Sequence, residues 1–75
     1  MIDWTKNMSN IASDGNPGKC PVCGNKNTDY KYSLIDSGWG YCDIWCNECK
    51  HAYHVSRVRV PETIPDKILP DNLLF

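Results

Sequence analysis

The stretch of sequence that decides the fold runs from Lys19 to His51 and contains two Cys-x-x-Cys pairs. The first pair lies within Lys19-Cys20-Pro21-Val22-Cys23-Gly24, and the second is Cys46-Asn47-Glu48-Cys49. Their separation is typical of two thiolate pairs that bind a single tetrahedral Zn²⁺. The sequence therefore predicts one structural zinc ion with four ligands, which are Cys20, Cys23, Cys46 and Cys49.

The turn chemistry around the cysteines agrees with this prediction. Pro21 presets φ for the first turn, and Gly24 can adopt a positive φ as the chain passes around the metal. The lysines Lys19, Lys26 and Lys50 flank the two pairs and would offset the negative charge of the thiolates. We expect each Cys-x-x-Cys to form a tight turn, here called a knuckle, that directs two sulfur atoms toward the metal.

The chain has 75 residues and a formal net charge of −1. So short a chain forms one small domain and usually needs a covalent or metal staple. A zinc ion on four thiolates supplies roughly 10–16 kcal/mol of apparent binding free energy, which becomes folding free energy when the metal-free chain is unfolded. The charge gives no general attraction to nucleic acid or to an anionic membrane.

The cysteine count and the lengths of the apolar segments predict where in the cell the protein is found. Five cysteines is an odd number, and the first residues lack a basic stretch followed by an apolar run. No apolar segment reaches the roughly 18 residues that a membrane span needs. We therefore expect a cytoplasmic protein without a membrane partner, whose cysteines bind metal and do not form disulfides.

Alternation predicts three strands. Polar and apolar residues alternate over 27–35, a turn follows at 36–40 with Trp39 at or near its tip, and a returning strand covers 41–46. A third strand is expected over 53–60, with Arg57 and Arg59 on the face of Tyr53 and Val55. The predicted fold class is a small metal-stabilised β fold with a three-stranded antiparallel sheet and two knuckles.

Two segments flank the predicted domain at 19–60. Residues 1–18 form either a flexible arm or a short helix, which Asp3 would cap and which would place Trp4, Met8 and Ile11 on one face. The polar run from Ser9 onward is expected to end it. Residues 61–75 are rich in proline yet apolar, and they either fold back over the sheet or dock on a partner.

The stretch 19–60 resembles a zinc ribbon, in which a knuckle, a hairpin, a second knuckle and a strand follow one another. The likeness rests on the two cysteine pairs and on the aromatic strand between them. One departure is Lys50, which stands where such ribbons often carry glycine. In size and motif the chain looks like the accessory ribbons of bacteria and their phages.

Nothing in the sequence predicts catalysis. A closed four-thiolate site has no open position for water or substrate. Ribbons of transcript-cleavage factors carry an Asp-Glu pair at the hairpin tip, whereas this tip reads Asp36-Ser37-Gly38-Trp39-Gly40. Cys42 is interpreted as a small buried apolar residue, with a reactive thiol or an alternative metal ligand as the other possibilities. His51 and His54 are assigned no role.

Aromatic and cationic residues on the expected sheet form a candidate contact surface, which comprises Trp39, Tyr41, Trp45, Arg57 and Arg59. The alternative is that the aromatics form the core of a thin domain. We favour a non-catalytic module that binds another macromolecule, preferably a protein, through this surface or through residues 64–75. One alternative is a ribbon that binds nucleic acid by stacking. Another is a redox or metal-handling protein that uses Cys42.

Overall fold

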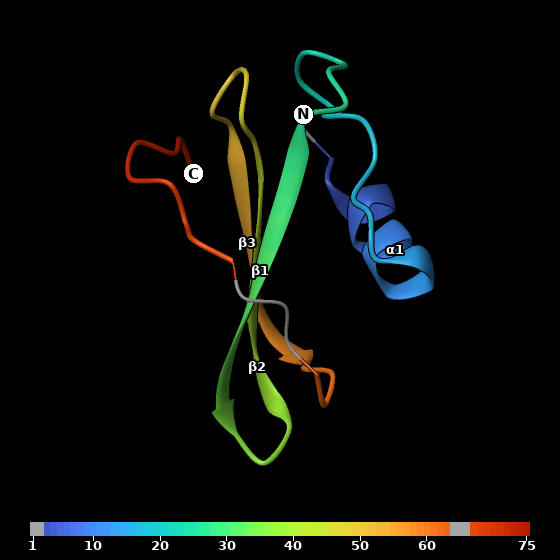
Figure 1. The fold of residues 1–75 in the computed structure, drawn as a ribbon, viewed down its shortest axis with the longest axis vertical. Helices are drawn as coiled ribbons and strands as arrows, with labels where there is room; N and C mark the ends of the chain where they lie inside the picture. Colours follow the sequence, from blue (N-terminus) through green and yellow to red (C-terminus); the bar gives the residue numbers. More distant parts are fainter. Residues whose placement is uncertain (1–2, 64–66) are drawn as a thin grey trace.

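The computed structural model describes residues 3–63 and 67–75, and within them one helix packs beside one sheet (Figure 1). The elements are α1 (Thr5–Asp14), β1 (Thr28–Asp36), β2 (Trp39–Cys46) and β3 (Ala52–Arg59). The strands are antiparallel in the order β1-β2-β3, so β2 is central. The predicted three-stranded antiparallel sheet is confirmed. The helix in the described part is too short and too polar to cross a membrane.

The hairpin between β1 and β2 closes through a tight two-residue turn. Ser37 and Gly38 have φ values of 42° and 85°, and Asp36 pairs with Trp39. Two successive residues at positive φ are typical of the type I′ turn that matches the twist of a hairpin. Trp39 is therefore the first residue of β2, next to the turn.

The third strand contains an irregularity that alternation alone does not reveal. Arg57 has a φ of 59°, and the register between β2 and β3 shifts so that Val58 pairs with Gly40 while Ser56 pairs with Tyr41. Arg57 is thus an extra residue that reverses the alternation after it. Arg59 consequently pairs with Trp39 on the face opposite to Val58. The prediction that Arg59 shares the face of Tyr53 and Val55 is wrong for this reason.

The helix occupies one face of the sheet, which we call the helix face. Trp4 and Ile11 are 3% and 5% exposed and pack with Tyr30, Cys42 and Ile44 into one core. Of the two expectations for the N-terminal segment, the structure has the helix. The Asp3 carboxylate accepts a hydrogen bond of 2.9 Å from the Thr5 N–H at its start.

The polar residues from Ser9 onward do not end the helix early, contrary to expectation. It continues through Asp14, where Gly15 adopts a φ of 76° and donates its N–H to the Ile11 carbonyl at 3.0 Å. This is a left-handed C-terminal cap. The burial of the apolar face of the helix outweighs the weak helix propensity of its serines and asparagines.

The opposite face of the sheet, here called the tail face, is also partly buried. Trp45 and Asp43 are 2% and 5% exposed, and the C-terminal segment lies on the side of the sheet away from α1 (Figure 1). Leu74 donates its N–H to the Lys50 carbonyl at 2.7 Å and accepts a bond of 2.9 Å from the Ala52 N–H. Residues 67–75 are therefore tied to the edge of β3, while Ile64 lies outside the described residues.

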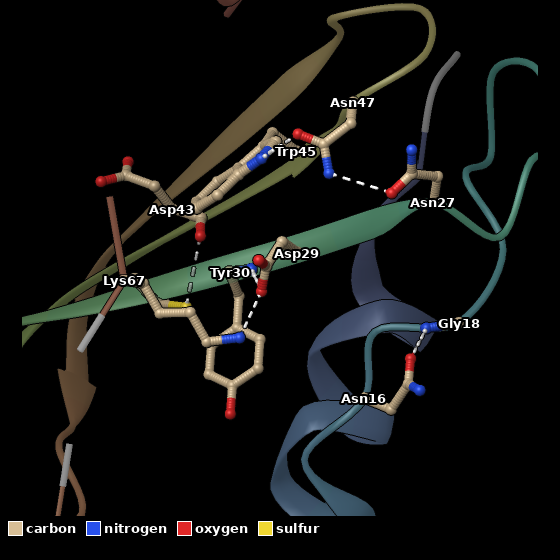
Figure 2. Close-up of polar contacts among 10 residues, drawn as sticks. Asn16, Gly18, Asn27, Asp29, Tyr30, Asp43, Trp45, Asn47 and Lys67 are labelled. Carbon is tan, nitrogen blue, oxygen red and sulfur yellow. Dashed lines mark hydrogen bonds and ion pairs between the residues drawn. The ribbon is translucent and has the colours of Figure 1, made fainter. Parts of the chain in front are cut away.

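The other end of this segment is tied to the edge of β1. Lys67 forms a 2.6 Å ion pair with Asp29, and its ammonium lies 4.9 Å from the centre of the Tyr30 ring, as Figure 2 shows. The segment thus contacts both edge strands. Whether it also docks on a partner stays a prediction.

Candidate metal centre

The four predicted ligands come together at one end of the sheet. Their Sγ atoms all lie within 4.8 Å of one another. Two close pairs join different knuckles: Cys20 to Cys49 at 3.6 Å and Cys23 to Cys46 at 3.6 Å. Sulfur atoms about 2.3 Å from a metal at the centre of a tetrahedron lie about 3.8 Å apart, whereas a disulfide needs about 2.0 Å. We call this group the four-cysteine cluster, and its geometry fits a metal ion.

The two knuckles are equivalent turns. The Gly24 N–H donates to the Cys20 carbonyl at 2.9 Å, and the Lys50 N–H donates to the Cys46 carbonyl at 3.0 Å. Gly24 has a φ of 75° and Lys50 a φ of 66°. Lys50 therefore adopts the left-handed conformation that the sequence comparison with ribbons assigns to glycine, at a cost of roughly 1–2 kcal/mol.

The cluster is buried unevenly. Cys46 and Cys20 are 0% and 2% exposed, whereas Cys23 lies on the surface and Cys49 is half-buried. Backbone groups also approach the sulfur atoms, and the Val22 N–H donates to Cys20 Sγ at 3.3 Å. Each knuckle thus contributes its first cysteine to the core and its second cysteine to the more exposed side of the cluster.

Burial and backbone N–H groups shift the pKa of the Cys46 thiol in opposite directions. Burial raises the pKa of Cys46, but hydrogen bonds from the N–H groups of Cys49 and Glu48 outweigh burial, and the pKa falls below its ordinary value. Burial raises the pKa of Cys49 to about 12. A bound metal would deprotonate all four thiols, because a coordinating thiol binds as thiolate.

A buried asparagine positions the first knuckle. Asn7 is 4% exposed, and its side-chain N–H₂ donates to the carbonyls of Pro17 and Lys19 at 2.9 and 2.8 Å. The bonds hold the segment that enters the first knuckle against α1. The sequence analysis missed Asn7, although its spacing of three from Trp4 and four from Ile11 places it on the buried face of the helix.

Another asparagine positions the second knuckle. Trp45 Nε1 donates to Asn47 Oδ1 at 3.0 Å, and Asn47 Nδ2 donates to Asn27 Oδ1 at 3.2 Å (Figure 2). The Asn47 backbone N–H also donates to the Asn27 carbonyl at 2.8 Å. The second knuckle is thereby attached to the residue just before β1.

The fifth cysteine is outside the cluster. Cys42 is 0% exposed on the helix face, and its Sγ lies 3.9 Å from the Asp43 carbonyl. Burial, followed by the nearby Asp43 charge, raises its pKa to about 12. These surroundings match the interpretation of Cys42 as a small buried apolar residue. His54 Nδ1 lies 2.7 Å from Asp43 Oδ1, and neither His51 nor His54 belongs to the cluster.

The residues of the candidate contact surface differ in burial and in their position along the strands. Trp45 is buried, and the half-buried Tyr41 lies against the His54 ring at 5.0 Å between centres. Trp39, Arg57 and Arg59 gather at the hairpin end of the sheet, far along the strands from the four-cysteine cluster. Burial therefore removes Trp45 from the predicted contact surface, and partner binding by the other four residues stays a prediction.

These features define the class: a small β protein whose three-stranded antiparallel sheet carries, at one end, four cysteines positioned to hold a metal ion. Comparison with known proteins adds no family to this class. No family model, curated protein or solved structure matches the chain.

Proposed function

We propose that the four-cysteine cluster binds one Zn²⁺ and that the chain is a structural zinc ribbon. The observation that carries the proposal is the set of Sγ distances, which leaves room for one tetrahedral ion and excludes a disulfide. A tetrahedral site of four thiolates is a donor set that zinc prefers. The ion would link the two knuckles and so hold the start of β1 to the end of β2.

The proposed module is non-catalytic. Four protein ligands complete the coordination of zinc, so no position is left at which the metal could activate water. The redox alternative relied on Cys42, and a buried thiol with a pKa raised to about 12 is a poor nucleophile near neutral pH. All five cysteines are free, and a zinc–thiolate protein suits the reducing cytoplasm, where we place it.

The C-terminal segment supports a protein partner. Residues 67–75 are tied to both edge strands, yet their apolar side chains face solvent. The exposed fractions are 88% for Ile68, 37% for Leu69, 55% for Leu74 and 69% for Phe75. Apolar side chains gathered on one ordered segment are typical of a protein-binding surface. We propose that the ribbon presents this segment to another protein.

A pull-down with matched variants tests the partner. The bait is the full chain, and the variant is Ile68→Ser with Phe75→Ser. The control is Leu34→Ser, which removes a residue of 57% exposure at the other end of the sheet. We expect the control to retain every protein that the wild type enriches and the tail variant to lose them. Equal capture by all three baits would contradict a tail-mediated interaction.

A second candidate function is nucleic-acid binding, which the grouping of Trp39 with Arg57 and Arg59 favours. The group lies at the hairpin end, so it does not compete with the C-terminal segment for the same surface.

A further inference from the structure

An open cavity of about 430 Å³ lies at the hairpin end of the sheet, away from the four-cysteine cluster. Three side chains of different chemistry line it: the Asp36 carboxylate, the Trp39 ring and the Arg57 guanidinium. Its size falls within the range of roughly 300–1,000 Å³ that small-molecule sites occupy. The three groups together offer an aromatic face, an acceptor and a cationic donor.

The aromatic wall is exposed and supported. Trp39 is 47% exposed although it belongs to the central strand. The Arg59 guanidinium lies 5.8 Å from the centre of its ring, within the range of a cation–π contact. Arg59 pairs with Trp39 across the sheet, so the two are fixed by the strand register. Trp39 is therefore a stacking platform held in place by its neighbour.

The cationic wall depends on a strained residue. Arg57 has a φ of 59° and is the extra residue of the irregularity in β3. Bulges re-aim side chains, and a residue other than glycine in this conformation costs roughly 1–2 kcal/mol. The strained backbone conformation of Arg57 thus occurs at the residue whose guanidinium lines the cavity beside Trp39.

The charged groups at the cavity are not neutralised by one another. The ion pairs found in the described part of the chain join His54 to Asp43 and Lys67 to Asp29, and neither includes a cavity residue. Asp36 Oδ1 accepts a bond of 3.1 Å from the hydroxyl of Ser37. Asp36 therefore keeps acceptor capacity and Arg57 its donors for a ligand.

Building on the second candidate function, nucleic-acid binding, we propose that this cavity binds a base of single-stranded nucleic acid and prefers guanine. The base stacks on Trp39, Arg57 donates to guanine O6 and N7, and Asp36 accepts from its N1–H and N2–H₂ groups. Arg59 contacts a neighbouring phosphate. Guanine satisfies both charged walls with one planar ring, whereas thymine has no amino group for Asp36. A duplex is excluded because neighbouring base pairs cover both faces of its guanine, which leaves no face to stack on Trp39, and because guanine N1–H is paired with cytosine.

The chemistry of the cavity also separates this ligand from a peptide. An acidic segment would be attracted by Arg57 but repelled by Asp36, and a basic segment the reverse. The small number of cations agrees with the net charge of −1, since only a short stretch of backbone needs to be neutralised. With one phosphate contact, from Arg59, the slope of log K against log salt would be about −0.7.

Fluorescence anisotropy of two labelled oligonucleotides tests the proposal. One is a thymine-only single strand, and the other carries isolated guanines in the same background. We expect the zinc-loaded full chain to bind the guanine strand more tightly at low ionic strength. Trp39→Ala should weaken that binding by about tenfold, the equivalent of one lost stacked base. Asp36→Asn should abolish the preference for guanine and leave thymine binding at least as strong.

Matched variants separate the site from general effects. Tyr53→Ala removes another aromatic side chain of 47% exposure and should change nothing. Arg57→Gly removes the guanidinium while suiting the positive φ, so this variant folds and should still lose binding. Zinc content, measured for each variant, reports on the metal site independently.

Three results would overturn the proposal. The first is that neither oligonucleotide binds at low ionic strength, and the second is that Trp39→Ala and Tyr53→Ala weaken oligonucleotide binding equally. The third is that a glutamate–leucine peptide binds at these residues in place of the oligonucleotides. The last result would assign the cavity to an acidic protein segment.

Discussion

Gly40 lies where two backbones of the hairpin approach most closely. A Cβ atom at this position would stand 1.8 Å from the Ser33 carbonyl oxygen. Since the clashing atom is backbone, it cannot move aside as a flexible side chain would. We expect Gly40→Ala to lower the free energy of unfolding by about 3 kcal/mol, the upper part of the usual range for overpacking. Denaturant titration of the metal-loaded protein measures the change.

Gly38→Ala is the matched control for that substitution. Gly38 has a φ of 85° but no atom within 4 Å of an added Cβ, so only its backbone conformation is penalised, by roughly 1 kcal/mol. If the two variants lost equal stability, the close approach at Gly40 would not be the cause.

At Lys50, in contrast, substitution by glycine should increase the stability of the fold. Its φ of 66° costs a lysine more than a glycine, although glycine also loses more chain entropy on folding. We predict that Lys50→Gly raises the free energy of unfolding by about 0.5–1 kcal/mol. Lys50→Ala keeps the strain and should give no gain. A destabilised Lys50→Gly variant would show that the lysine side chain supports the knuckle.

The buried thiol of Cys42 should not react with thiol reagents. With a pKa raised from 9.0 to about 12, it has almost no thiolate at pH 8. At a pH between these two pKa values, the Cys42 thiol is deprotonated in the unfolded chain but still protonated in the folded chain. Cys42 therefore lowers the free energy of unfolding as the pH rises through this range. Alkylation of the metal-loaded protein, followed by mass spectrometry, should leave Cys42 unmodified at pH 8. Modification of Cys42 with the metal still bound would contradict its assigned burial.

At the scale of elements, α1 is joined to the metal site by polar contacts as well as apolar packing. Asn7 makes two hydrogen bonds to the segment before the first knuckle, both with carbonyl groups. Asn7→Ala removes the side-chain donor of the Lys19 carbonyl and leaves the Pro17 carbonyl with Asn10 alone, and it should cost about 2 kcal/mol of stability. It should also weaken metal binding, because the first knuckle is no longer held against the helix.

Asn10→Ala is the control for this helix. Asn10 is less buried and makes one such bond, of 3.1 Å, to the Pro17 carbonyl. Its loss should cost about half as much. Thermal unfolding of both variants, with metal affinity from competition with a chelator, distinguishes them. Equal effects would mean that Asn7 has no special role.

The sheet was predictable from sequence because its signals are local. The alternation in β1 and the glycines near Trp39 specify the hairpin, and the cysteine spacing specifies which strand ends meet. The shift at Arg57 was not predictable, since no glycine or asparagine marks the residue that adopts a positive φ. The spacing alone predicted which four of the five cysteines would cluster.

The packing of α1 and of the C-terminal segment on the sheet was harder to predict from the sequence. Trp45 alternates as an exposed residue would, but the C-terminal segment shares its side of the sheet and it is buried. This burial depends on contacts between residues far apart in sequence, which alternation does not encode. The same holds for α1, whose polar residues argue for an early end while its apolar face packs on the sheet.

At the scale of the whole molecule, most of β2 is buried, and the two candidate sites lie at its opposite ends. The helix covers one face, the C-terminal segment lies along the other, the four-cysteine cluster lies at one end, and the Trp39 cavity lies at the opposite end (Figure 1). Each covering layer is a single short segment. We therefore expect the proposed zinc ion to supply stability that these thin layers lack.

Titration of the metal-free, reduced chain with Zn²⁺, followed by circular dichroism, tests this central claim most directly. We predict an unfolded spectrum without metal and a signal of the folded sheet that rises linearly and stops at one zinc ion per chain. Cys46→Ser should fail to reach that signal. A chain that shows the full sheet signal before any metal is added, or that shows no change at any zinc concentration, would contradict the account.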